Sequence, residues 1–136
     1  MGIALADSIR TIRATALLTA LDAGSGPAIM EFYTATQPAK GVAITDQTLL
    51  GSVTFSDPAG VIANCVLTMS PIADDILADN DGIITWARIL DGDGVFVADL
   101  TVTNNAGAGP IKMASTQVYA GGIIRVTAAV LTEGNA

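Results

Sequence analysis

The amino-acid sequence predicts a mainly β domain preceded by a single N-terminal helix. After Pro27, short apolar runs with an alternating pattern are divided by turn residues about every eight to twelve positions. Before Pro27, apolar residues recur at spacings of three and four, which is typical of an amphipathic helix. Such a series of strands is typical of a jelly-roll-like β-sandwich or a barrel. We expect a helix or arm over residues 1–26 and a β domain over residues 27–136.

The helix is expected over residues 3–23. Asp7 lies near its start, where a carboxylate interacts favourably with the positive end of the helix dipole. Gly24, Gly26 and Pro27 predict where it ends. Its main apolar stripe consists of Leu5, Ile9, Ile12, Ala16 and Ala20, and it is widened by Leu17, Leu18 and Leu21. So broad an apolar face predicts packing on the sheet of the same chain or on a neighbouring subunit.

Two turns predict how some of the strands pair. The turn Asp57–Gly60 predicts a hairpin between the runs that flank it, and Asp91–Gly94 predicts another, because Asp-Gly supplies the positive φ that hairpins need. Thr36–Thr45 is expected to be an exposed loop. The strands themselves are expected in Ala28–Thr34, Leu49–Phe55, Val61–Met69, Ile83–Leu90, Val95–Val102, Ile111–Ala114 and Ile123–Leu131.

The composition argues against catalysis. The chain has no histidine and one cysteine, and only 14% of its 136 residues are charged whereas 51% are hydrophobic. General acid–base chemistry near neutral pH, or a metal site, normally needs residues that are scarce here. Cys65 lies in an apolar run without a cationic neighbour, which predicts a buried, unreactive thiol. We expect no enzyme activity, no catalytic residue and no cofactor.

Two acidic turns raise the question of a calcium site. They are Asp79–Gly82 and Asp91–Gly94. An EF-hand loop needs a glutamate at its twelfth position, whereas counting from the two turns reaches Leu90 and Val102. Asp-Gly is also ordinary hairpin chemistry. The sequence therefore predicts no bound metal.

The charge pattern limits the possible partners. The net charge is −7, and the six basic residues are scattered, so no basic patch for nucleic acid is present in the sequence. No run of apolar residues is long enough to cross a membrane. The mean hydropathy of +0.55 is high for a soluble monomer. Apolar surface beyond one core usually meets a partner, so we expect a homodimer or homotrimer.

Arg88 is the one charge inside an apolar run. At strand spacing it shares a face with Ile84, Trp86 and Leu90. A buried arginine needs a partner, for which Asp99 on the neighbouring strand is the candidate. Two alternatives remain open, an ion pair between subunits and an exposed strand face. Trp86 is expected in the core, with its indole N–H donating to one partner.

Several segments resemble a group of small virion proteins of tailed bacteriophages. The segments are LLGSVTFSDPAG, ITWARILDGDGVFVADLTV and the closing GGIIRVTAAVLTEGNA, after an N-terminal helix. The resemblance covers most of the chain. It implies a β-rich structural protein, jelly-roll-like in some members, that decorates an HK97-type capsid as an oligomer.

This resemblance implies a decoration (cement) protein that is made in the host cytoplasm and binds the outer surface of the capsid. Its partners would be the major capsid protein and further copies of itself. The expected interface residues are Ile9, Ile12 and Leu17 on the helix, with Arg88 as a buried ion-pair member. Alternatives are a tail, baseplate or head-fibre component, and a receptor-binding module.

Overall fold

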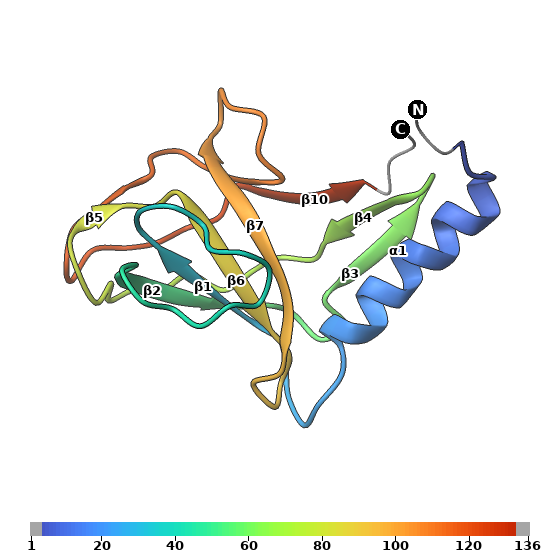
Figure 1. Ribbon diagram of the computed structural model, residues 1–136, viewed down its shortest axis with the longest axis horizontal. Helices are drawn as coiled ribbons and strands as arrows, with labels where there is room; N and C mark the ends of the chain where they lie inside the picture. Colours follow the sequence, from blue (N-terminus) through green and yellow to red (C-terminus); the bar gives the residue numbers. More distant parts are fainter. Residues whose placement is uncertain (1–3, 133–136) are drawn as a thin grey trace.

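The computed structural model describes residues 4–132 (Figure 1). Helix α1 (Asp7–Leu21) is followed by strands only, which confirms a mainly β chain with one N-terminal helix. The strands are β1 (Ile29–Tyr33), β2 (Leu49–Thr54), β3 (Gly60–Ala63), β4 (Val66–Met69), β5 (Gly82–Ile83), β6 (Trp86–Leu90), β7 (Phe96–Asn104), β8 (Ile111–Met113), β9 (Gln117–Val118) and β10 (Ala128–Thr132).

Eight strands form one mixed sheet that curls into a half-barrel (Figure 1). Their order is β2-β1-β6-β7-β8-β10-β4-β3, and every neighbouring pair is antiparallel except β7 and β8, which are parallel. Strands β5 and β9 form a separate two-stranded sheet at one end. A jelly-roll strand order is not shown by this topology.

The core lies on the concave side of the half-barrel. Alternate residues of each strand point to it, as the two-residue period of a strand requires. The fully buried side chains there include Met30, Phe32, Leu50, Leu67, Ile84, Ile89, Ile111 and Ile124. Helix α1 adds Leu21, and its leucines Leu17 and Leu18 pack against the same cluster.

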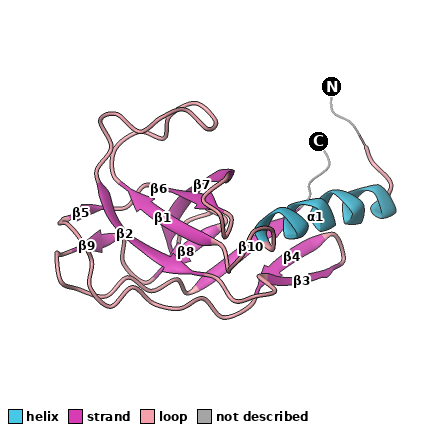
Figure 2. Cartoon of the chain, turned by 90° about the horizontal axis from the view of Figure 1, so that it is seen from below, coloured by secondary structure: helices cyan, strands magenta, loops and turns pink. Residues whose placement is uncertain are grey.

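Helix α1 lies against the β3–β4 hairpin and is shorter than the 3–23 expected from the sequence (Figure 2). Residues 4–6 are not helical, and residue 3 lies outside the described residues. The helix ends at Leu21, and Gly24 then adopts a positive φ of +90°. A Cβ on Gly24 would lie 2.8 Å from the backbone nitrogen of Asp93, so the position requires glycine. The predicted stop signal is therefore confirmed.

One predicted hairpin is confirmed and the other is wrong. Strands β6 and β7 pair across the Asp91–Gly94 turn. In contrast, β2 pairs with β1, and Val61–Met69 forms a hairpin by itself, β3 with β4. The reason is a tight turn at Asn64 and Cys65, whose φ values of 51° and 65° are those of a two-residue hairpin turn.

The remaining strand predictions hold in part. Thr36–Thr45 is a loop in which all residues except Pro38 and Ile44 are exposed, as expected. The expected strand Ile83–Leu90 is divided into β5 and β6. The expected strand Ile123–Leu131 is regular only from Ala128, because Ile124 instead forms an isolated bridge with Asp75.

Candidate interaction surfaces

Arg88 and Asp99 form a bidentate ion pair on the convex side of the sheet. They are direct cross-strand partners on β6 and β7. Nε of Arg88 donates to Oδ1 of Asp99 at 2.8 Å, and Nη2 donates to Oδ2 at 3.0 Å. The guanidinium lies over the rings of Trp86 and Phe96, 5.4 and 5.3 Å from their centroids. Hydrogen bonding to Asp99 raises the pKa of Arg88 above its ordinary value.

The loop that joins β1 to β2 covers this pair. The Gly41 N–H donates to Oδ2 of Asp99 at 3.3 Å, and the Trp86 indole donates to the Thr34 carbonyl at 3.2 Å. A Cβ on Gly41 would lie only 3.3 Å from the Phe96 ring, so the loop backbone lies close to the aromatic side chain. The prediction that the Trp86 indole N–H donates to one partner is confirmed. The side chain is buried, but on the convex side of the sheet.

Tyr33 extends the same cluster. Its ring stacks on Trp86 with centroids 4.8 Å apart, and its hydroxyl donates to Oε1 of Glu31 at 3.2 Å. Burial, and then the neighbouring carboxylate of Glu31, raise the pKa of Tyr33 from 10.0 to about 12. Every polar side-chain group of the cluster named here has a partner within the same chain. The structure therefore shows Arg88 buried and paired with Asp99 of its own chain, the candidate partner that the sequence predicts, and not on an exposed strand face.

The outer side of α1 carries two large apolar side chains that face solvent, among exposed polar residues that include Ser8 and Thr19. Ile9 and Ile12 are 43% and 62% exposed, and Ala16 is exposed beside them. Residues 9, 12, 13 and 16 share one side of a helix, so Arg13 lies on the same face. The inward face carries Ala14, Leu17, Leu18 and Leu21 instead. We call Ile9, Ile12, Arg13 and Ala16 the helix face.

Leu17 differs from the other two expected helix contacts. It packs against the core cluster and lines an apolar groove of about 300 Å³ between α1 and β7. Leu100 and Leu131 line the same groove. The structure therefore places Ile9 and Ile12 on the outside and Leu17 on the inside of the helix.

A second exposed apolar surface lies at the end of the molecule opposite α1, where β5 and β9 are found (Figures 1 and 2). Two loops meet there through backbone hydrogen bonds, from Ala78 N to Gly122 O at 2.9 Å and from Gly121 N to Ala78 O at 2.8 Å. Four large side chains of these loops are between 61% and 75% exposed. They are Ile76, Leu77, Tyr119 and Ile123, which we call the apolar tip.

Carboxylates surround the apolar tip. Asp79 and Asp81 are exposed on the segment that leads from Leu77 into β5, and Asp81 accepts the Ala120 N–H at 2.6 Å. The arginine of this region, Arg125, is bonded to Asp74, with Nη2 2.7 Å from Oδ2. The end that carries the apolar tip is therefore acidic. Sequence reasoning missed this surface, because its residues lie more than forty positions apart along the chain.

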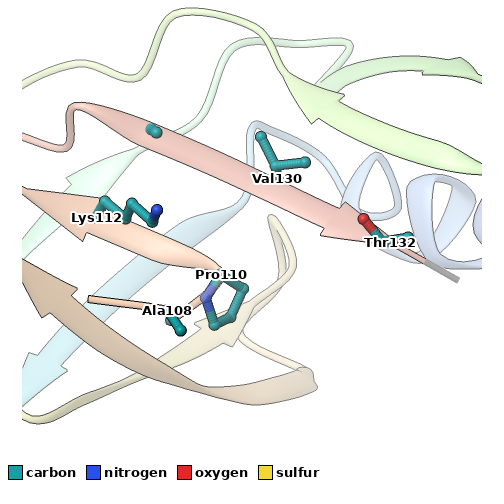
Figure 3. Close-up of a pocket in the computed structure, with 7 residues that line it drawn as sticks. Ala108, Pro110, Lys112, Val130 and Thr132 are labelled. Carbon is teal, nitrogen blue, oxygen red and sulfur yellow. The ribbon is translucent and has the colours of Figure 1, made fainter. Parts of the chain in front are cut away.

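A shallow groove runs along β8 and β10 (Figure 3). Its volume is about 390 Å³, and Lys112 is the one ionisable side chain that lines it. The other lining residues are small or apolar, among them Pro110, Val130 and Thr132. A single lysine without a carboxylate or imidazole in the lining is no basis for assigning a catalytic role to this groove.

The acidic turns use their carboxylates for backbone hydrogen bonds. Oδ1 of Asp91 accepts the N–H groups of Asp93 and Val95, both at 2.9 Å. Asp93 accepts the backbone N–H and the hydroxyl of Ser25, which connects the turn to the segment after α1. Within residues 4–132, no three potential metal-ligating side chains among His, Cys, Asp and Glu lie together.

Cys65 is buried, as expected, in the turn between β3 and β4. Its thiol donates to the backbone oxygen of Asp7 at 3.5 Å and lies 3.8 Å from the Thr11 hydroxyl. The turn thus contacts the first turns of α1. The helix is too short to cross a membrane, and the part of the chain that the structure describes contains no other helix.

Comparison with known proteins found no matching family model, no similar curated protein and no matching solved structure.

Proposed function

We propose that this chain is a decoration protein of a tailed-phage capsid, which bridges neighbouring major capsid subunits on the outer surface of the shell. The resemblance of its sequence segments to small virion proteins supports this role. So does one structural observation, that exposed large apolar side chains lie at two opposite ends of the molecule, on the helix face and on the apolar tip. A protein that joins two neighbours needs two contact surfaces that are far apart.

The proposed mechanism is adhesion rather than chemistry. Apolar area removed from water contributes about 25 cal/mol per Å². A stable contact between proteins buries about 800 Å² on each partner. Two modest contacts on one rigid chain reinforce each other, because binding at one end raises the effective concentration at the other. The sheet between the ends keeps them at a fixed separation.

A shell-binding experiment tests the proposal. Purified protein is added to capsid shells that lack it, and the bound copies are counted and located by electron cryo-microscopy. We expect binding on the outer surface in numbers comparable to the major capsid protein, and weaker binding for Ile12→Asp and for Leu77→Asp. Val42→Asp is the matched control, because Val42 is 48% exposed but lies beside Gly41 on the covering loop.

Other outcomes of this experiment would support the alternatives. A handful of copies at one vertex or on the tail would contradict a shell coat and favour a tail, baseplate or head-fibre component. Adhesion to host cells without binding to shells would favour a receptor-binding module. A jelly-roll-like sandwich stays a prediction, which an experimental structure of the assembled shell would test.

A further inference from the structure

We infer that the middle of the covering loop is a strap that opens and closes over the Arg88–Asp99 pair while the sheet stays folded, with the contact of Gly41 as its latch. The strap is residues 36–46, within the loop between β1 and β2. The inference concerns motion within one chain. It goes beyond the proposed function and does not rest on it, since it needs neither a shell nor a second copy.

The two ends of the strap are fixed to the sheet. The Thr34 N–H donates to the Thr48 carbonyl at 3.1 Å, and the Thr48 N–H donates back to the Thr34 hydroxyl at 3.0 Å. Beside them, the hydroxyl of Thr85, which directly precedes β6, donates to the Ala35 carbonyl at 2.5 Å. These bonds form a base on which the strap can move without disturbing β1 or β2.

Hydrogen bonds within the loop hold the strap in shape. The Val42 N–H donates to the Ala39 carbonyl at 3.0 Å. The side chain of Gln47 donates to the Thr36 carbonyl at 2.6 Å and accepts the Thr45 N–H at 3.2 Å. None of these three bonds involves a strand, so they can persist when the strap leaves the sheet. We therefore expect the strap to move as one unit.

One contact at the tip holds the strap closed. Within residues 4–132, the Gly41 N–H is the one group of the strap that forms a hydrogen bond beyond the loop, and its acceptor, Oδ2 of Asp99, lies 3.3 Å away. All residues of the strap except Pro38 and Ile44 are exposed, so its movement uncovers little apolar area of its own. A segment held by so few interactions opens at a much lower cost in free energy than the unfolding of the whole domain.

The ion pair beneath the strap does not depend on the latch. Arg88 and Asp99 share two hydrogen bonds of their own on directly paired strands, and the guanidinium lies over the rings of Trp86 and Phe96. Opening would leave this pair in place but expose the Asp99 carboxylate, whose side chain is 2% exposed when the strap is closed. The strap thereby controls whether a carboxylate and the Phe96 ring on the convex side of the sheet are open to solvent.

Amide hydrogen exchange of the whole chain, measured by NMR, tests the inference. The protection of an amide is the ratio of its exchange rate in an unstructured peptide to its rate in the protein. We expect the Gly41 amide to be protected, and its protection to be insensitive to urea below the unfolding transition, because opening of the strap exposes little new surface. The slowest amides of β1 and β6 should instead exchange faster as the urea concentration rises.

Gly41→Ala tests the latch itself. Gly41 has a φ of +71°, and a Cβ there would lie 3.3 Å from the Phe96 ring, so alanine disfavours the closed position. We expect the protection of the amide at position 41 to fall about tenfold, while the slowest amides of β1 and β6 keep their rates. Val42→Ala is the matched control, because Val42 is the next residue and is 48% exposed. Its protection at position 41 should stay within about twofold of the unmodified chain.

Three results would overturn the inference. Exchange at Gly41 with the urea dependence of the β6 amides would mean that the loop opens only when the sheet unfolds. Exchange at the rate of an unstructured peptide would mean that the latch does not form in solution. Equal protection at position 41 in Gly41→Ala and in the unmodified chain would mean that another contact holds the strap. None of these results depends on shell binding, so the strap and the decoration role fail separately.

Discussion

Arg88 and Asp99 face each other across β6 and β7 and share two hydrogen bonds of 2.8 and 3.0 Å beneath a loop that closes over them. The Asp99 side chain is 2% exposed. Its carboxylate also accepts a hydrogen bond from the Gly41 N–H. The ion pair therefore connects β6 and β7 with each other and with the covering loop. The cation is further held between Trp86 and Phe96.

Removal of one partner of this pair should destabilise the fold strongly. Asp99→Ala leaves a buried guanidinium without its counter-ion, for which we expect a loss of about 3 kcal/mol in the free energy of unfolding. The double variant Arg88→Met with Asp99→Leu should lose less, because no charge stays buried. Urea denaturation measures both. Arg125→Ala, at the exposed pair with Asp74, is the control and should change stability little.

The ion pair was predictable because the physics that requires it is local. A single charge in an apolar strand needs a partner, and the Asp91–Gly94 turn makes β7 the neighbouring strand. A bulge between Ile89 and Leu90 then shifts the register so that Asp99 lies opposite Arg88. The same reasoning failed for Leu49–Phe55, since a turn signal such as Asp57–Gly60 marks a change of direction but not which strand becomes the neighbour. The tight turn instead lies at Asn64 and Cys65, where cysteine occupies a position that glycine usually marks.

The interaction surfaces were only half predictable. Periodicity predicted a helix with Ile9 and Ile12 on one stripe, but large apolar side chains lie on both sides of α1. Which side packs inward depends on the shape of the half-barrel, because Leu17, Leu18 and Leu21 pack against its core. The apolar tip could not be foreseen, because loop-to-loop hydrogen bonds bring Leu77 and Ile123 to the same end. The parallel pairing of β7 with β8 likewise depends on how the whole sheet curls.

A pair of glycine substitutions tests the connection after α1. Gly24→Ala should destabilise the protein by about 1–2 kcal/mol, because φ is +90° and the new Cβ would contact the Asp93 backbone. Gly26→Ala is the matched control two residues away. Its Cβ would meet nothing within 4 Å, so stability should stay equal or rise slightly. Equal losses in thermal unfolding for both variants would contradict this account of the turn.

Ionisation of Tyr33 should weaken the fold at high pH. The pKa of Tyr33 is raised to about 12 in the folded chain, above its ordinary value of 10.0, so folding favours the neutral phenol. This contribution to stability is complete below pH 10 and is lost as the pH rises through 12. Tyr119→Phe leaves Tyr33 as the only tyrosine, since the chain has two. Tyrosinate absorbance of that variant should then titrate near pH 12, whereas titration near pH 10 would contradict the burial and Glu31 effects.

The orientation of α1 can be tested by truncating one side chain on each face. Leu21 is fully buried, so Leu21→Ala should lower the free energy of unfolding by about 2–5 kcal/mol through lost contacts and a cavity. Ile12 is 62% exposed, and Ile12→Ala should change stability by less than about 0.5 kcal/mol. Urea unfolding of both variants at a concentration where the chain is monomeric separates folding from association. Equal losses would mean that the isoleucine side of the helix also packs on the core, and the helix face would then not be available to a partner.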